Sequence, residues 1–218
     1  RVLNIQRMND VVQGIGRSLQ QGAKVFWVCP LVEESEKFDL AAAEDRHVHL
    51  SQVFGSQVGL IHGRMKAAEK DAAMVAFING DVKVLVATTV IEVGVDVPDA
   101  TVMVIEHAER FGLAQLHQLR GRIGRGDAES NCLLLYAQPL SETAKARLKI
   151  MRETEDGFVI AEEDLKLRGA GELLGTRQSG IAEFRMADLT SHSELLAIAR
   201  DDAALFLQRD PHLESERG

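Results

Sequence analysis

"VKVLVAT", residues 82–88, is an apolar run rich in β-branched side chains, and similar runs recur along the chain. The others are KVFWVC (24–29), VGLIH (58–62), TVMVIE (101–106) and CLLLYA (132–137). Runs that are apolar at nearly every position are typical of strands buried on both faces. Segments of helical character separate most of them, and this alternation favours right-handed βαβ units. The sequence therefore predicts an α/β fold with a parallel sheet flanked by helices.

The segment KAAEKDAAMVAFING (66–80) is predicted to be one of these helices. Asn79 and Gly80 supply its stop signal. The residues expected on its core face are Ala68, Ala72, Val75 and Phe77 or Ile78. Further on, VPDA (97–100) is typical of a turn, and we expect it to join two adjacent strands.

The alternation ends near residue 138, and a different pattern follows. SETAKARLKIMRE (141–153) and GFVIAEEDLKL (157–167) are predicted to be helical. They lead into a glycine-rich stretch, LRGAGELLGTRQSG (167–180), expected to be a loop, and a last helix is expected near 190–208. The predicted organisation is therefore a sheet domain over residues 1–138 and a helical hairpin, loop and C-terminal helix over 139–218.

Composition limits the class of protein. The formal net charge of −8 argues against indiscriminate coating of nucleic acid, although a local basic stripe can still bind phosphates. No stretch approaches the roughly 20 apolar residues of a membrane span. The chain begins at Arg1 without a charged-then-apolar leader, so we expect no secretory signal and expect part of a longer protein. Cys29 and Cys132 lie in apolar runs and are interpreted as buried, reduced thiols, which fits the cytoplasm.

Three arginines stand within six positions of QLHQLRGRIGRG (115–126). If this stretch is helical through residue 125, Gln118, Arg122 and Arg125 share one face and Arg120 points away. The guanidinium group is always charged and its planar fork can bind two phosphate oxygens at once. A phosphate site is one interpretation, and a solvated basic face paired with acidic residues is the other. The two glycines at 121 and 124 each disfavour a helix by about 1 kcal/mol, which the close approach of a backbone or a ligand would explain.

The segment TTVIEVGVDVPDATVMVIEHA (88–108) begins at the carboxyl end of the strand predicted at 82–88. Ligands of open parallel sheets gather at those ends, so threonines, a glycine and an acid there are well placed for a phosphate backbone or a nucleotide.

These motifs carry a resemblance to a known family. ATTVIEVGVDVP (87–98) and HQLRGRIGR (117–125) resemble motifs V and VI of superfamily-two helicases, and HGRMK (62–66) resembles the motif that precedes them. The resemblance implies the second of two RecA-like lobes that clamp ATP, a P-loop NTPase-like fold without its own P-loop. It implies that Arg122 and Arg125 act as arginine fingers, with Gln118 as the first polar residue of the motif. It further implies nucleic-acid contacts from Thr88, Thr89, His62 and Arg64, and a nucleotide cleft lined by Gly94 and Asp96.

The tail FVIAEEDLKLRGAGELLGTRQSG (158–180) closely resembles the segment that follows the second lobe in the RecG family of bacterial branched-DNA translocases. There the helical hairpin and its loop, the TRG motif, couple ATP turnover to movement on duplex DNA. The resemblance implies coupling roles for Arg168, Glu172, Arg177 and Gln178. It also implies a monomeric bacterial enzyme, in the cytoplasm at the nucleoid, that remodels stalled replication forks and Holliday junctions in DNA repair and recombination. Its partners would be branched double-stranded DNA and the first lobe and wedge domain of the same polypeptide.

Two groups that ATP hydrolysis needs are missing from the 218 residues. The sequence holds neither a G-x-x-x-x-G-K-[ST] loop nor a strand that ends in a D-E-x-H-like acid pair. ATP and Mg²⁺ are therefore expected to be bound mainly by the first lobe, and this chain alone is expected to be inactive. His62, His107 and His117 do not show metal-ligand spacing with the cysteines, so no metal site is predicted. The motor lobe of a transcription-repair coupling factor and a non-catalytic domain that binds DNA or a partner remain as alternatives.

Overall fold

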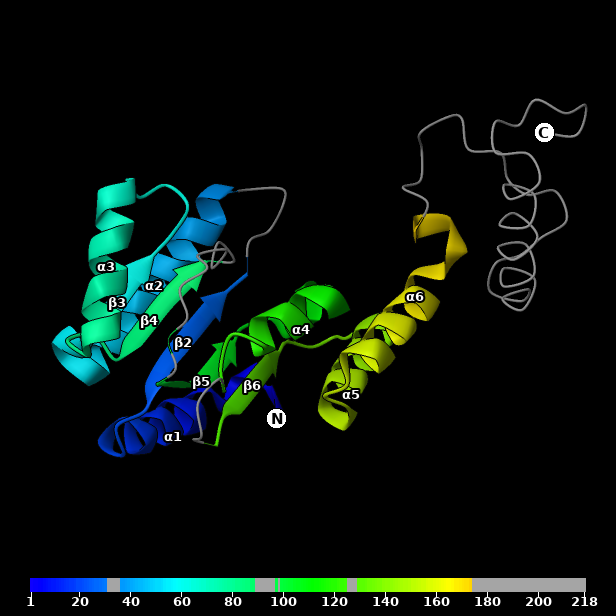
Figure 1. Ribbon diagram of the computed structural model, residues 1–218, viewed down its shortest axis with the longest axis horizontal. Coiled ribbons are helices and arrows are strands. Elements are labelled where there is room, and N and C mark those ends of the chain that lie inside the picture. Colours follow the sequence, from blue (N-terminus) through cyan, green and yellow to red (C-terminus); the bar gives the residue numbers. More distant parts are fainter. Residues whose placement is uncertain (31–35, 89–96, 98, 125–128, 174–218) are drawn as a thin grey trace, which may run out of the picture. The chain divides into compact units, whose positions relative to one another are not determined.

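The computed structural model describes residues 1–30, 36–88, 97, 99–124 and 129–173, with the backbone alone at 36–39 and 168–173. The chain divides into two compact units, Arg1–Ala161 and Glu162–Gly218. The first unit holds the sheet (Figure 1). None of the helices in the described part of the chain is long and apolar enough to cross a membrane.

A six-stranded, all-parallel sheet forms the centre of the first unit, in the order β1-β6-β5-β2-β4-β3. Its strands are β1 (Val2–Asn4), β2 (Lys24–Cys29), β3 (Val58–Ile61), β4 (Val84–Thr88), β5 (Ala100–Ile105) and β6 (Asn131–Tyr136). Each of the five predicted runs is a strand, and every residue of the central strands β2 and β4 is buried. The α/β prediction is confirmed. The short edge strand β1 was not predicted, because three residues are too few to show a periodic pattern.

Helices cover both faces of this sheet. The helices of the described residues are α1 (Met8–Gln20), α2 (Glu36–Phe54), α3 (Ala67–Asn79), α4 (Leu113–Arg120), α5 (Glu142–Glu153) and α6 (Gly157–Leu173), with short 3₁₀ turns η1 (Ile5–Arg7), η2 (Gly55–Gln57) and η3 (Ala108–Arg110), and those that cover the sheet are α1 to α4. The crossovers through α1 and α2 run in one direction along the sheet, and those through α3 and α4 run in the other. Because such crossovers are right-handed, α1 and α2 cover one face, called here the first face, and α3 and α4 cover the second.

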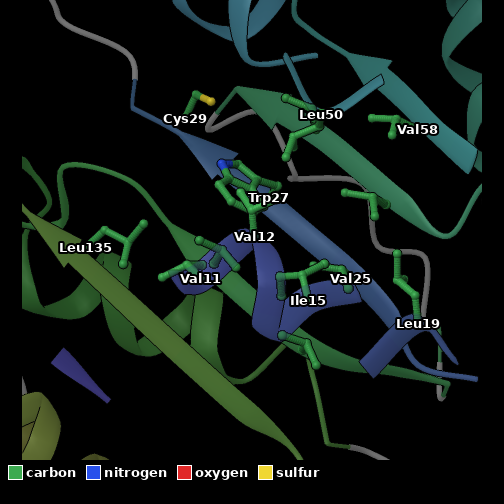
Figure 2. Packing of buried hydrophobic residues seen from close by; sticks show 14 of the residues in the cluster. Val11, Val12, Ile15, Leu19, Val25, Trp27, Cys29, Leu50, Val58 and Leu135 are labelled. Atoms are coloured by element: carbon green, nitrogen blue, oxygen red, sulfur yellow. The ribbon is translucent and has the colours of Figure 1, made fainter. Parts of the chain in front are cut away.

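The core on the first face joins α1 and α2 to alternate residues of the strands. Trp27 of β2 is fully buried there, among side chains that include Val11, Val12 and Ile15 of α1 and Leu50 of α2 (Figure 2). On the second face, the ring of Phe26 lies 4.9 Å from that of Phe77 in α3, measured between centroids. Neighbouring residues of β2 thus point to opposite faces, and each face has its own core.

The predicted turn at 97–100 is present, but it does not join adjacent strands. The Ala100 amide donates to the Val97 carbonyl at 2.9 Å, as a turn requires. However, β2 lies between β4 and β5 in the sheet. The two strands on either side of this turn are therefore separated by β2, a relation between strands that local turn chemistry cannot show.

Helix α3 has the predicted bounds, but the predicted core face is wrong except at Phe77. Gly80 ends the helix in the left-handed conformation, with φ of 87°. Met74 and Phe77 are the buried residues, whereas Val75 and Ile78 are 54% and 44% exposed. A helix this rich in alanine carries little facial contrast, so its sequence did not determine which side packs on the sheet.

The second part of the chain also differs from prediction. Helix α5 belongs to the first compact unit, which ends at Ala161, while the boundary at 138 remains a prediction about domain organisation. Helix α6 continues through Leu173, so residues 167–173 are helical and not part of a loop. The glycines at 169 and 171 did not stop it. The rest of the predicted loop, 174–180, and the predicted helix near 190–208 lie outside the described residues.

Two substitutions in α3 test which face is core. Phe77→Ala removes a fully buried ring and is expected to lower the free energy of unfolding by about 3–5 kcal/mol through the lost burial and the cavity left behind. Val75→Ala, at an exposed site, is expected to change it by less than about 0.5 kcal/mol. Urea denaturation followed by circular dichroism measures both. Equal destabilisation by the two variants would contradict the packing of α3.

Candidate nucleotide and nucleic-acid interface

Helix α4 carries the arginine-rich segment, and the structure shortens it. The Gln115 side chain accepts a hydrogen bond from the Gly112 amide at 3.0 Å and caps the first turn. The helix ends at Arg120, so the prediction of a helix through 125 is wrong. Gly124 is incompatible with a helix through 125, because its φ is 76°, and a Cβ there would lie 2.4 Å from Ser130 Oγ. Glycine is needed at 124 for the close approach of another part of this chain.

The arginines of this segment have different roles in the structure. The Arg120 guanidinium donates to the carbonyls of Met151 and Thr154, at 3.1 and 2.9 Å, and so binds the C-terminal end of α5. Arg122 lies just after α4, where its amide donates to the Leu119 carbonyl at 3.0 Å. Arg125 lies outside the described residues. Arg120 is therefore a structural residue, as its predicted direction away from the shared face suggested.

Arg122 and Gln118 are the members of the predicted phosphate-binding set that the structure describes here. Gln118 is exposed on α4 and Arg122 is partly exposed. Within the described part of the chain, no carboxylate forms a salt bridge with the Arg122 guanidinium. The alternative of a basic face paired with acidic residues therefore finds no support at Arg122, which presents a charge that an anion can meet.

A second arginine fixes the start of α4 to α5. Arg147 of α5 donates from Nη1 to the Phe111 carbonyl at 2.6 Å and from Nη2 to the Glu109 carbonyl at 3.3 Å. Together with Arg120, it holds the two ends of α4 against one helix. Hydrogen bonds from a charged donor to carbonyls contribute about 1.5–3 kcal/mol each, so α4 is held firmly in place.

Two predicted nucleic-acid residues lie side by side at the carboxyl edge of the sheet. The parallel register pairs Ile61 with Ala87, so His62 and Thr88 follow as neighbours at the ends of β3 and β4. Thr88 is 2% exposed, and among the described residues neither its Oγ1 nor the buried Nδ1 of His62 has a hydrogen-bond partner. Unsatisfied buried polar atoms are uncommon and each is costly, so they mark places where a ligand or water completes the bonding. Arg64 is exposed in the turn after His62.

The remaining predicted residues are not placed. Thr89, Gly94, Asp96, Arg177 and Gln178 lie outside the described residues, as does Arg125. Arg168 and Glu172 belong to the last turns of α6, where only the backbone is described. The structure therefore places His62 and Thr88 side by side, with Arg64 in the turn after His62, and places Gln118 on α4 and Arg122 just after it.

The structure also reveals a buried cluster that the sequence did not indicate. Glu106 follows β5 directly, and its carboxylate accepts hydrogen bonds from Trp27 Nε1 at 2.5 Å and from Arg46 of α2. The Arg46 guanidinium also lies over the Trp27 ring, with Cζ 5.7 Å from the ring centroid. These residues are far apart in the sequence and share no motif, so only tertiary structure could assemble them.

Neither cysteine is suited to thiol chemistry or metal binding. Burial, and then the nearby Glu106 carboxylate, raise the pKa of the Cys29 thiol far above its ordinary value. Burial raises the pKa of the Cys132 thiol to about 11. Both therefore stay protonated at neutral pH. Across the described ranges, no group of three His, Cys, Asp or Glu side chains is arranged to hold a metal ion.

The parallel sheet, the crossovers and the arginine-bearing segment after β5 define the class of protein, a RecA-like lobe of the helicase type. The chain belongs to the helicase conserved C-terminal domain family, whose model matches residues 5–127. A second model, for domain 3, C-terminal, of the ATP-dependent DNA helicase RecG, matches residues 154–217.

Individual relatives support the same assignment. The chain is 54% identical over 96% of its length to ATP-dependent DNA helicase RecG from Acidithiobacillus ferridurans, and covers 31% of that protein. It is 55% identical over 84% of its length to RecG from Escherichia coli K12, and covers 27% of it. The chain thus spans less than a third of these relatives. The predicted resemblance to RecG is confirmed.

Solved structures agree. A structure of RecG bound to a three-way DNA junction matches 89% of this chain and 25% of that chain, with a TM-score of 0.69 and 44% identity. Domain 2 of the DEAD-box helicase Mss116p matches 76% of this chain and 67% of that chain, with a TM-score of 0.56 and 16% identity, which shows the fold alone.

The two arginines that flank Gly121 are expected to differ sharply in their effect on stability. Arg120→Ala removes the hydrogen bonds to the carbonyls of Met151 and Thr154 and should lower the free energy of unfolding by about 3 kcal/mol or more. Arg122→Ala removes a side chain with no salt bridge among the described residues and should change it by less than about 0.5 kcal/mol. Thermal and urea denaturation of the 218-residue chain measure both. A larger loss for Arg122→Ala would contradict the division of roles.

Proposed function

We propose that this chain is the second motor lobe of a RecG-type, ATP-dependent double-stranded DNA translocase that remodels stalled replication forks and Holliday junctions in DNA repair and recombination. The observation that carries the proposal is the helicase-type lobe joined in one chain to a segment that matches RecG domain 3. The three-way junction bound by the similar RecG structure supports branched DNA as the substrate.

In this proposal Arg122 and Arg125 are arginine fingers that reach ATP bound on a first lobe, with Gln118 beside them. The partly exposed Arg122 and its lack of a salt bridge among the described residues support this role. A finger contributes about 10³–10⁵ in rate, or roughly 4–7 kcal/mol of transition-state stabilisation. Because the fingers and the phosphates are on different lobes, hydrolysis requires closure, and closure can be tied to a step along DNA.

The first lobe would hold the triphosphate and Mg²⁺, because this chain has neither a phosphate-binding loop nor, in its described part, a carboxylate group arranged for a metal. When bound there, Mg²⁺ would neutralise charge on the phosphates. Gly94 and Asp96 would line the nucleotide cleft from this side.

On the nucleic-acid side, Thr88, Thr89, His62 and Arg64 would contact the DNA backbone. Thr88 Oγ1 and His62 Nδ1, which have no hydrogen-bond partner within the described ranges, support this part, because a phosphate or a bridging water would supply the missing partners. Arg168, Glu172, Arg177 and Gln178 would couple hydrolysis to movement. The protein would act as a monomer in the bacterial cytoplasm at the nucleoid, with its first lobe and wedge domain in the same polypeptide.

Removal of a finger tests the proposal in the longer polypeptide that carries the first lobe. Arg122→Ala and Arg125→Ala are each expected to lower DNA-stimulated ATP hydrolysis by about 10³-fold, because the charge on the transferring phosphate loses its partner. Phosphate release measures the rate. Arg110→Ala, at an exposed arginine of η3, is the matched control and should leave the rate unchanged. Rates within twofold of wild type for both finger variants would refute the assignment.

Thr88→Val tests the nucleic-acid contact separately, since it replaces the hydroxyl by a methyl group of similar size. Because Oγ1 is buried and has no hydrogen-bond partner in the part of the chain that the structure describes, the variant should be at least as stable as the wild type. Loss of one contact to the backbone should weaken binding of a three-way junction by about 5- to 10-fold, a free-energy difference of about 1 kcal/mol. Fluorescence anisotropy measures the affinity. Unchanged affinity in a stable variant would exclude Thr88 from the interface.

A further inference from the structure

The carboxylate of Glu106 joins three elements of the first unit. Its Oε1 accepts from Trp27 Nε1 and Arg46 Nε, and its Oε2 accepts from Arg46 Nη2 at 3.0 Å. Its own amide donates to the Val28 carbonyl at 2.9 Å and extends the sheet by one bond. The residue is only 6% exposed. A buried charge of this kind persists only where its partners satisfy it, so Glu106 is fixed in both backbone and side chain.

The next residue is strained. His107 has φ of 47° and is the one non-glycine residue with positive φ in the described part of the chain. Such a conformation is unfavourable for residues with a Cβ and persists where surrounding contacts enforce it. The His107 ring lies 3.0 Å from a carboxylate oxygen of Glu109, measured from Nδ1. A residue in the left-handed conformation thus directly follows the buried, hydrogen-bonded Glu106.

This turn carries the chain from one face of the sheet to the other. The Glu106 side chain points to the first face, where it meets Trp27 and Arg46 of α2. The connector 107–112 then leads to α4 on the second face. The connector also accepts hydrogen bonds at Glu109 Oε2 from the Ala137 amide, just after β6, at 3.2 Å, and at two carbonyls from Arg147 of α5. Glu106 is therefore where the connector to α4 is tied to the α2 layer.

From this geometry we infer that Arg46 and Glu106 are positioning residues for α4. They fix the start of the connector, which enforces the turn at His107 and sets the place of the helix that ends next to Arg122. Both side chains are largely buried, with exposed fractions of 19% and 8%, so the pair is assigned a positioning role and no contact with nucleotide or DNA. Its relevance to ATP hydrolysis rests on the proposed function, whereas its effect on the order of α4 does not.

Hydrogen exchange measured by mass spectrometry tests the order of α4 in the 218-residue chain. Glu106→Gln keeps an acceptor for Trp27 but leaves Arg46 without its charged partner. It is expected to speed exchange at least tenfold in peptides from 107–120, with peptides from α3 changed less than twofold. Glu142→Gln, which alters an exposed ion pair with Lys145, is the control and should change neither region. Equal acceleration in α3 and α4 would show a general loss of stability and overturn the inference.

A double variant separates positioning from stability. Arg46→Met with Glu106→Gln removes both charges, and replacement of a buried ion pair by groups of similar volume is often neutral or stabilising. We expect its melting temperature to return towards that of the wild type, while exchange in 107–120 stays at least fivefold faster. Recovery of both together would overturn the inference.

The link to catalysis is measured in the longer polypeptide with its first lobe. At a temperature where both proteins are folded, the double variant should hydrolyse ATP with kcat reduced at least tenfold and KM for ATP within about twofold, because binding depends on the first lobe. Unchanged kcat beside faster exchange would refute the catalytic link and leave the positioning of α4 standing. If the wild type itself lacks DNA-stimulated ATP hydrolysis, the proposed function fails and the exchange result is unaffected.

Discussion

Strand β2 has hydrogen-bonded neighbours on both sides and helical layers over both faces, so all six of its residues are buried. The other strands and the helices of the first unit pack around β2 and keep it out of contact with solvent. Alternate residues point to separate cores, with Phe26 toward α3 and Trp27 toward α1 and α2. The crossover that follows β2 runs in one direction along the sheet, and the connections that follow its neighbours β4 and β5 run in the other. In open parallel sheets, ligands bind at the carboxyl ends of strands where the direction of the crossovers changes in this way.

The arginines around α4 show how one residue type serves two purposes. The guanidinium groups of Arg120 and Arg147 donate hydrogen bonds to backbone carbonyls and hold α4 against α5. Arg122 makes no salt bridge within the described ranges, although it stands two residues from Arg120. In the proposed function, Arg122 meets a phosphate on another lobe, so it has to be held in place without being neutralised. Arg120 and Arg147 hold α4 in place, and Arg122 follows the end of that helix.

Much of the fold could be read from the sequence, and the errors have physical causes. Five strands were predicted because a parallel sheet buries both faces and leaves continuous apolar runs. The core face of α3 was missed because alanine contributes little to facial contrast, and the length of α4 was missed because the left-handed Gly124 and its contact with Ser130 are tertiary features. Of the candidate site, local motifs indicated His62, Thr88, Gln118 and Arg122, while Arg46 and Glu106 gave no local signal.

The sequence by itself determined the class of fold and the kinds of side chain available for phosphates, since burial periodicity and charged forks are local properties of the chain. Tertiary structure alone decided that β2 separates β4 from β5, and that Trp27, Arg46 and Glu106 meet. It also decided which arginine remains available. These relations depend on the order of the strands and the handedness of the crossovers. Neither property can be recognised from the residue type at any single position of the sequence.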